Sequence, residues 1–196
     1  YNNEVYTGNL KDIINDSVSQ IRFLKDGGGS GYDIVIIRAY RNVYVSGIES
    51  SDVVYGSNRE TVKIDSSKYS LLRVFDVSGQ SQSVSYITTQ SLISVFESAS
   101  GKYMDIYVNK KPVKGKIDLI ESDKISIDGV TYKAKDENVL NGVRAGDNVE
   151  VYCDISGYIG HIKALESAEN YAYLAKMNLD SYRLYLKMFT DGNEMK

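Results

Sequence analysis

The chain has 196 residues and a mass of 21.9 kDa, which corresponds to one domain or two small ones. Hydrophobic residues make up 42% and charged residues 25%, a globular balance that excludes a disordered tail. The formal net charge is −3 and the 23 lysines and arginines are scattered, so no face for nucleic acid is predicted. No apolar run reaches the roughly 20 residues of a membrane helix, so we expect no membrane insertion.

Two reactive residue types occur once each and limit the chemistry of the chain. Cys153 is the only cysteine, so an internal disulfide and a thiolate zinc cluster are excluded, and we expect it to be a small filler within a strand. His161 is the only histidine, and we expect it on the solvent face of a strand. One histidine leaves little room for general acid–base catalysis, so no enzyme is expected. Because residue 1 is tyrosine, the chain is expected to be a fragment or a processed product.

Residues 1–110 are predicted to form a first β-rich unit. Residues 9–16 are candidates for one or two helical turns near its start. The run 32–48 is rich in Val and Ile and is long enough for two strands or for one bent strand, and another strand is predicted at 103–108. Glycine after a small polar residue punctuates the strand-like runs, because tight turns need a residue that tolerates positive φ. These pairs are Ser78-Gly79, Ser100-Gly101, Asp128-Gly129, Ser156-Gly157 and Asp191-Gly192.

Residues 111–165 are predicted to form a second, smaller unit. It begins after the basic pair Lys110-Lys111, next to Pro112, the only proline of the chain. Apolar and polar residues alternate at 124–128 and at 148–152, as in half-buried antiparallel strands. The succession of strands and turns predicts a small SH3-like or OB-like β barrel.

Residues 166–196 are predicted to form a third element. A short helix is expected at 167–173, and a hairpin from the strand-like runs 171–177 and 182–189. The hairpin would begin a further module or complete the first one. The fold class expected for the whole chain is therefore mainly β: two small antiparallel units, sandwich-like or barrel-like, with one or two short helices.

The glycine-rich segment 25–33 is the most conspicuous loop. Its side-chain oxygens come only from Asp26, Ser30 and Asp33, the candidates for a calcium site, since hard cations require several oxygen ligands. The alternative is a flexible hairpin connection without a ligand. The loop lacks the Lys-Ser/Thr ending of a phosphate-binding loop, so no nucleotide is expected. Apart from calcium, no cofactor is predicted.

Tyrosine is the one residue type in excess, with 17 copies against 4 phenylalanines and no tryptophan. Tyr32, Tyr40 and Tyr44 are the candidates for contact with a partner, because tyrosine is enriched at protein interfaces. The alternative is packing within the sheet, where a flat ring lies across the pleat. Acidic residues near the second unit's turns are interpreted as turn formers rather than a glycosidase pair. They are Asp123, Asp128, Asp136 and Glu137.

Three groups of motifs occur in order along the chain. The first is SVSQIRFLKDGGGSGYDIVIIRAYRNVYVSGIES at residues 17–50, a strand, a Gly-rich loop ending in Tyr-Asp and a hydrophobic strand. The second comprises IDGVTY at 127–132, GDNV at 146–149 and YCDISGYI at 152–159. The third is YAYL at 171–174 followed by LKMFTDG at 186–192. Together these motifs resemble modules of clostridial and other Firmicutes surface proteins that bear S-layer homology domains. The chain lacks the wall-anchoring S-layer homology motif itself, so wall-polymer binding is not carried over.

The resemblance implies a non-catalytic structural or assembly module at the bacterial cell surface, whose partners are neighbouring proteins. Similar modules in virion structural proteins of phages imply the alternative, a tail, neck or capsid component. A third hypothesis is a module that binds a glycan or a receptor through tyrosines. The expected location is extracellular or at the cell surface, or else in the virion.

Overall fold

The chain is described by a computed structural model that covers residues 1–2, 5–12, 18–25, 27, 34–50, 53–57, 60–165, 173–180 and 183–189. The mainly β fold is confirmed: strands dominate, and the helical elements are the short 3-10 turns η1 (Leu10–Asp12), η2 (Val84–Tyr86) and η3 (Glu137–Leu140). Among these residues, no helix is both long and apolar enough to cross a membrane.

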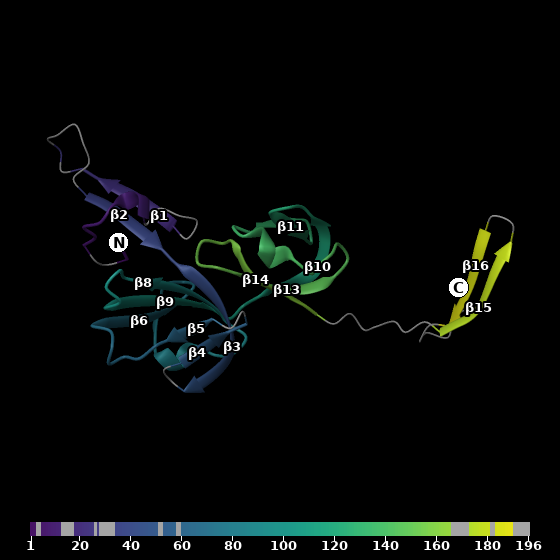
Figure 1. Ribbon diagram of the computed structural model, residues 1–196, viewed down its shortest axis with the longest axis horizontal. Helices are drawn as coiled ribbons and strands as arrows, with labels where there is room; N and C mark the ends of the chain where they lie inside the picture. Colours follow the sequence, from purple (N-terminus) through teal and green to yellow (C-terminus); the bar gives the residue numbers. More distant parts are fainter. Residues whose placement is uncertain are drawn as a thin grey trace.

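The first unit is built on a seven-stranded sheet with the order β5-β4-β3-β8-β9-β6-β7 (Figure 1). Its strands are β3 (Arg41–Ser50), β4 (Val53–Gly56), β5 (Thr61–Lys63), β6 (Leu71–Asp76), β7 (Ser81–Gln82), β8 (Leu92–Glu97) and β9 (Tyr103–Asn109). The expected antiparallel pairing holds for every ladder of this sheet except one, because β6 and β9 run parallel. Parallel neighbours need a crossover, which the chain makes here through β7, η2 and β8.

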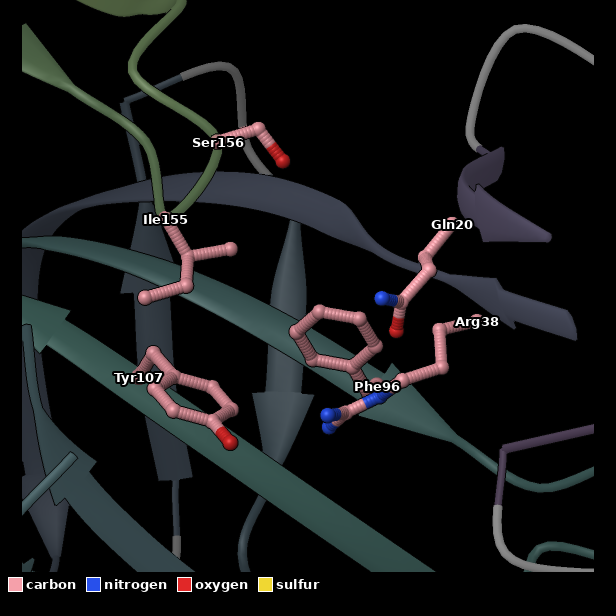
Figure 2. A pocket seen from close by; sticks show the side chains of 6 residues that line it. All are labelled: Gln20, Arg38, Phe96, Tyr107, Ile155 and Ser156. Carbon is pink, nitrogen blue, oxygen red and sulfur yellow. The ribbon is translucent and has the colours of Figure 1, made fainter. Parts of the chain in front are cut away.

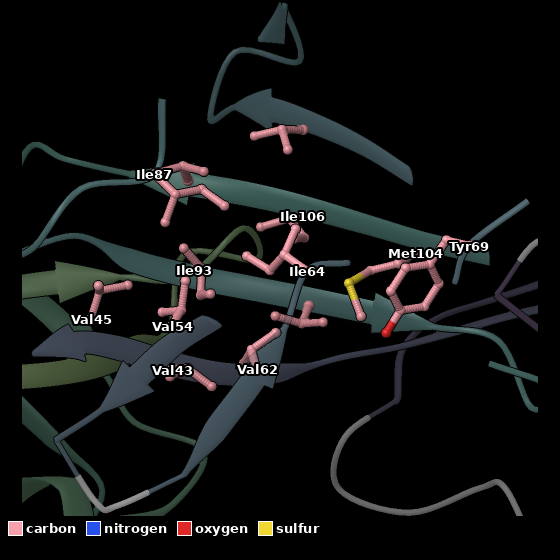
Figure 3. Packing of buried hydrophobic residues seen from close by; sticks show 13 residues of the cluster. Val43, Val45, Val54, Val62, Ile64, Tyr69, Ile87, Ile93, Met104 and Ile106 are labelled. Carbon is pink, nitrogen blue, oxygen red and sulfur yellow. The ribbon is translucent and has the colours of Figure 1, made fainter. Parts of the chain in front are cut away.

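The core of the first unit lies on the inner face of this sheet. Figure 3 shows branched aliphatic side chains from β3, β4, β5, β8 and β9 meeting in one cluster. Its members include Val43, Val45, Val54, Val62, Ile64, Tyr69, Ile93, Met104 and Ile106. Val45, Ile93 and Ile106 are fully shielded from solvent, and burying such a side chain contributes about 1.5–3 kcal/mol.

A two-stranded hairpin precedes this sheet, formed by β1 (Val18–Leu24) and β2 (Ile34–Ala39). Only Tyr40 separates β2 from β3, so the predicted run at 32–48 is nearly continuous strand over its described part. The N-terminus is tied to this point: the Asn2 side chain donates to the carbonyls of Ala39 and Glu97, each at 2.8 Å. It also accepts from the Ala39 amide at 2.9 Å, so Asn2 bridges β2 and β8.

The second unit is a five-stranded antiparallel sheet with the order β12-β11-β10-β13-β14. These strands are β10 (Val113–Ile120), β11 (Lys124–Ile127), β12 (Val130–Lys133), β13 (Asn148–Cys153) and β14 (Ile159–Ala164). The first half of β10 pairs with β13 and its second half with β11, so the sheet folds around a separate core that includes Ile117, Ile125 and Val149. The expected closed barrel is not formed. Across residues 111–165, all of them described, the single bridge Ala134–Ile159 links the two edges.

The glycine turns are confirmed wherever the structure describes them. Gly79, Gly101, Gly129 and Gly157 all have φ between 68° and 86°. Asp128 and Gly129 both have positive φ and form the two-residue loop between β11 and β12, which is the backbone of a type I′ turn. The Asp191-Gly192 pair lies outside the described residues.

The third element contains the predicted hairpin, formed by β15 (Tyr173–Asp180) and β16 (Arg183–Phe189). The short helix expected at 167–173 lies outside the described residues except for Tyr173, which begins β15. In the region expected to be helical at 9–16, the structure describes one 3-10 turn, η1, and residues 13–16 are outside the description.

Candidate functional site

The two units meet at a junction that we define by β3 and β8 on one side, and by β14 with the preceding turn, residues 153–158, on the other. These elements are far apart in the sequence and meet only in the folded chain: Tyr40 and Asp154, which are hydrogen-bonded here, are 114 positions apart. In the described part of the chain, hydrogen bonds and an aromatic stack join the two units at this junction.

Asp154 is the centre of the junction and is 6% exposed. One carboxylate oxygen accepts hydrogen bonds from the Tyr40 hydroxyl at 2.6 Å and from the Asn42 amide at 3.1 Å. The other oxygen accepts from the backbone amides of Ser156 and Tyr158, both at 2.9 Å, which closes the turn. The carboxylate is thus satisfied by donors from both units. Burial, reinforced by Asp154, raises the pKa of Tyr40, so its hydroxyl stays a donor.

Two further polar contacts cross the junction. The Ser94 hydroxyl donates to the Asn42 side-chain oxygen at 2.8 Å and accepts from the Ile155 amide at 3.3 Å. The Asn109 amide donates to the Cys153 carbonyl at 2.8 Å. These bonds order the turn 153–158 against the first sheet.

An aromatic contact lies beside this network. The Tyr44 ring stacks on the His161 imidazole with 3.7 Å between centroids, and Tyr152 contacts the Tyr44 ring edge-on at 5.1 Å. The expectation that His161 faces solvent is therefore wrong: it is half-buried because the first unit covers its strand. Burial, with a smaller effect of Lys163, lowers the pKa of His161 to about 4, so the imidazole is neutral at physiological pH.

A cleft of about 520 Å³ opens along one side of the junction. Its walls carry amide, hydroxyl, carboxylate, ammonium and aromatic groups, including Tyr40, Asn42, Lys135, Asn138, Asp154 and His161. Both Asp154 and His161 border it, but no hydrogen bond joins these two side chains in the described structure. Asp154 is occupied by four donors and His161 is a weak base, so the pair is not arranged as an acid–base couple.

A smaller hollow, of about 330 Å³, lies where β1, β2 and the turn at Ser156 approach the first sheet (Figure 2). The Arg38 guanidinium covers the Phe96 ring at 4.5 Å from its centroid and lies near Tyr107. Arg38 is also 3.6 Å from the carboxylate of Asp105, which Arg73 binds through two bonds of 2.8 Å. The floor of this hollow is thus a packed cation–aromatic layer.

The β1–β2 hairpin, which we call the apolar hairpin, exposes large hydrophobic side chains on both faces. Directly paired residues share a face, so Phe23 lies with Val35 on one face, and Leu24 with Ile34 on the other. Phe23 is 54% exposed and Ile34 is 56% exposed. Ile21, Leu24 and Ile36 are also exposed. Single exposed apolar residues are ordinary at a protein surface, whereas these five are clustered on one hairpin.

The residues predicted to form a calcium site, Asp26, Ser30 and Asp33, lie outside the described residues, as does Tyr32. No group of three or more His, Cys, Asp or Glu suited to a metal occurs in the part of the chain that the structure describes. Tyr40 is 6% exposed, and both it and Tyr44 turn toward the second unit of the same chain.

The remaining singled-out residues fall into two groups. Cys153 is half-buried against the second core, and burial raises the pKa of its thiol. The acidic residues Asp123, Asp128, Asp136 and Glu137 are all exposed, and Asp136 caps η3 by accepting from the Asn138 amide. The sequence interpretation missed Asp154, although the Asp-x-Ser-Gly pattern at its turn was a usable signal, because Asp commonly closes such turns.

Comparisons with protein-family models, with curated proteins and with solved structures find no significant match to this chain. The resemblance to surface-protein modules therefore remains an expectation from the sequence motifs.

Proposed function

We propose that the chain is a non-catalytic structural module that assembles with neighbouring proteins at a bacterial cell surface. The observation that carries this proposal is the apolar hairpin. A two-stranded hairpin is marginal by itself in water, and this one exposes hydrophobic residues on both faces. A neighbouring protein that covers Phe23 and Ile34 would remove this apolar surface from water and so gain free energy.

The junction supports the same function from another side. A module that holds a fixed position in an assembly needs units with a fixed relative orientation. Units that moved freely would lose that freedom on docking, and this loss of entropy would weaken binding. Hydrogen bonds to Asp154 and the Tyr44–His161 stack tie the units through both polar and aromatic contacts. Tyr40 and Tyr44, two of the three tyrosines predicted to contact a partner, contact the second unit of the same chain. We therefore propose the apolar hairpin as the docking surface.

The experiment compares the wild type with Phe23→Ser/Ile34→Ser and with the control Leu119→Ser, whose side chain is 55% exposed on the second unit. Sedimentation over a range of concentrations should show weak self-association of the wild type and of the control, and a monomer for the double variant. Cosedimentation with clostridial cell walls, and separately with phage particles, distinguishes the surface module from the alternative virion component. A wild-type protein that stays monomeric and binds neither material would refute the proposal.

A glycan-binding or receptor-binding module is the second candidate, favoured by the polar and aromatic lining of the 520 Å³ cleft. Clefts of this size with a few oriented polar groups are typical ligand sites. A glycan array tests it: binding that Asn138→Ala weakens supports this candidate, and an array without signal removes it.

A further inference from the structure

A third hollow, of about 550 Å³, lies where the connection from β9 to β10 faces the loop that precedes β8. We call it the lysine hollow, because Lys110, Lys111 and Lys114 line it together with one carboxylate, that of Glu150. Thr88, Thr89 and Gln90, which have polar side chains, also line it. None of these groups belongs to the apolar hairpin or to the Asp154 network.

The charges of this hollow do not cancel. Glu150 is 8% exposed and its carboxylate accepts from the Lys114 ammonium at 2.6 Å, a contact that lowers the pKa of Glu150 and keeps it ionised. Within the described residues, no carboxylate lies within 4.0 Å of the ammonium of Lys110 or Lys111. Three lysines against one glutamate leave two positive charges in the lining of a chain whose net charge is −3. The local field therefore favours an anion.

The two uncompensated lysines are not equivalent. The Lys110 ammonium lies 3.8 Å from the centroid of the Tyr86 ring, which holds the cation in place without neutralising it. Lys111 is exposed, and its backbone amide donates to the Asn109 side chain at 2.9 Å, which fixes the path of the connection. The Lys110 ammonium is thus held against Tyr86, whereas the exposed Lys111 ammonium can move toward a ligand.

The loop that precedes β8 supplies neutral donors to the lysine hollow. The side chains of Thr88, Thr89 and Gln90 are exposed and make no hydrogen bond in the described structure. Two hydrogen bonds nevertheless fix the backbone of this loop. The Ser91 hydroxyl donates to the Thr88 carbonyl at 2.6 Å, and the backbone N–H of Gln90 donates to the Val45 carbonyl at 2.9 Å. Gln90 has a φ of 60°, a conformation that non-glycine residues seldom adopt and that this loop maintains.

We propose that the lysine hollow binds a phosphate group of a monoester or a diester. Ammonium groups together with hydroxyl and amide donors suit a tetrahedral anion, which accepts hydrogen bonds in several directions at once. A planar carboxylate would be served better by the forked donors of arginine, and none lines this hollow. The site is independent of the proposed docking surface, so either can fail without the other.

The test is a titration of ¹⁵N-labelled protein with inorganic phosphate, glycerol 2-phosphate and diethyl phosphate, with sodium acetate, a planar carboxylate, at matched ionic strength as the reference. The first two probes represent free phosphate and a monoester, and the third a diester. We expect saturable shifts of the backbone amides at 88–91, 109–111, 113 and 114, with phosphate-bearing probes binding more tightly than acetate. Lys110→Ala/Lys111→Ala should raise the dissociation constant about tenfold or more, since hydrogen bonds to charged groups are the strong ones.

The matched control is Lys102→Ala/Lys133→Ala, which removes the same charge from two exposed lysines that do not line the hollow. It should bind as the wild type does. Because loss of Lys110 also removes the contact with Tyr86, Thr89→Val serves as a second variant and should weaken binding without changing charge. Shifts that do not saturate, shifts that acetate reproduces, or shifts that both double lysine variants reduce equally would overturn the proposal.

Discussion

Tyr44 of β3 and His161 of β14 stack nearly in parallel, with 14° between their ring planes. The two residues belong to units that have separate hydrophobic cores, so the stack is a contact between units rather than part of either core. An imidazole held in this way is covered by an aromatic ring on one side. It is therefore kept neutral by burial, and its protonation is linked to the stability of the junction.

The first prediction concerns pH. The unfolded chain protonates His161 near the ordinary pKa of 6.5, whereas burial lowers the pKa in the folded chain to about 4. Between these values the unfolded state binds more protons, so the free energy of unfolding falls as the pH drops from about 6.5 to about 4. Because the ring is only half-buried, we expect this residue to account for about 1 kcal/mol of the loss.

Urea unfolding at pH 7.5 and at pH 4.5 measures this loss. His161→Phe keeps an aromatic ring against Tyr44 but cannot take up a proton, so it should lose less stability than the wild type over the same interval. The carboxylates whose pKa is lowered in the folded state, such as Glu150, affect both proteins alike. An equal loss in the two proteins would show that His161 is not the linked group.

The second prediction concerns the closeness of the two units at Gly160. A Cβ atom placed on Gly160 would lie 2.6 Å from the Leu92 side chain and 3.2 Å from the Asn42 amide. Leu92 is 1% exposed and has little room to move, so Gly160→Ala should destabilise the protein by about 1–3 kcal/mol. Gly47→Ala is the matched control, since a Cβ on Gly47 meets nothing within 4 Å. Equal midpoints in urea for the two variants would mean that the units do not pack as described.

The third prediction concerns Asp154. Asp154→Ala leaves the buried Tyr40 hydroxyl and the Asn42 amide without their acceptor, so we expect a loss of about 2–4 kcal/mol in the free energy of unfolding. Asp123→Ala removes an exposed carboxylate with no side-chain hydrogen bond in the described structure and should change stability by less than about 0.5 kcal/mol. Tyr40→Phe should cost much less in the Asp154→Ala background than in the wild type, because the shared bond is already gone. Additive losses would argue against a direct bond.

Much of the fold follows from short-range patterns in the sequence. The alternation of Ile125 and Ile127 with polar residues places both in the second core, where they are at most 2% exposed. The turn at Asp128-Gly129 requires two positive φ angles, and the sequence supplies residues that tolerate them. Such features were predictable because period, turn and side chain all lie within a few residues of one another.

The junction between the two units was not predictable from such local patterns. The hydrogen bond between Tyr40 and Asp154 depends on how two units dock, and no local pattern encodes a contact over 114 positions. The parallel pairing of β6 with β9 is invisible for the same reason, since alternation does not report strand direction. Of the lysine hollow, the sequence reveals only the basic pair Lys110-Lys111. Its other lining residues, such as Thr88, come from a distant part of the sequence.

The last prediction concerns the buried ion pair of Asp105 and Arg73. The carboxylate is 2% exposed, and the Arg73 guanidinium binds both of its oxygens at 2.8 Å. Arg73→Leu should lower the free energy of unfolding by about 3 kcal/mol, because it strips a buried carboxylate of its bidentate partner. The double variant Arg73→Leu/Asp105→Leu should recover much of this loss, since the buried carboxylate is then gone and the remaining cation, Arg38, has a side chain that is 30% exposed to water. Arg41→Ala breaks a pair with Glu60 of similar length, 2.9 Å, whose side chains are each more than one-third exposed, and it should cost less than about 1 kcal/mol. A double variant less stable than Arg73→Leu would contradict this prediction and would show that Asp105 stabilises the fold without Arg73. Its contact with Arg38, which packs on Phe96, would then account for that stabilisation.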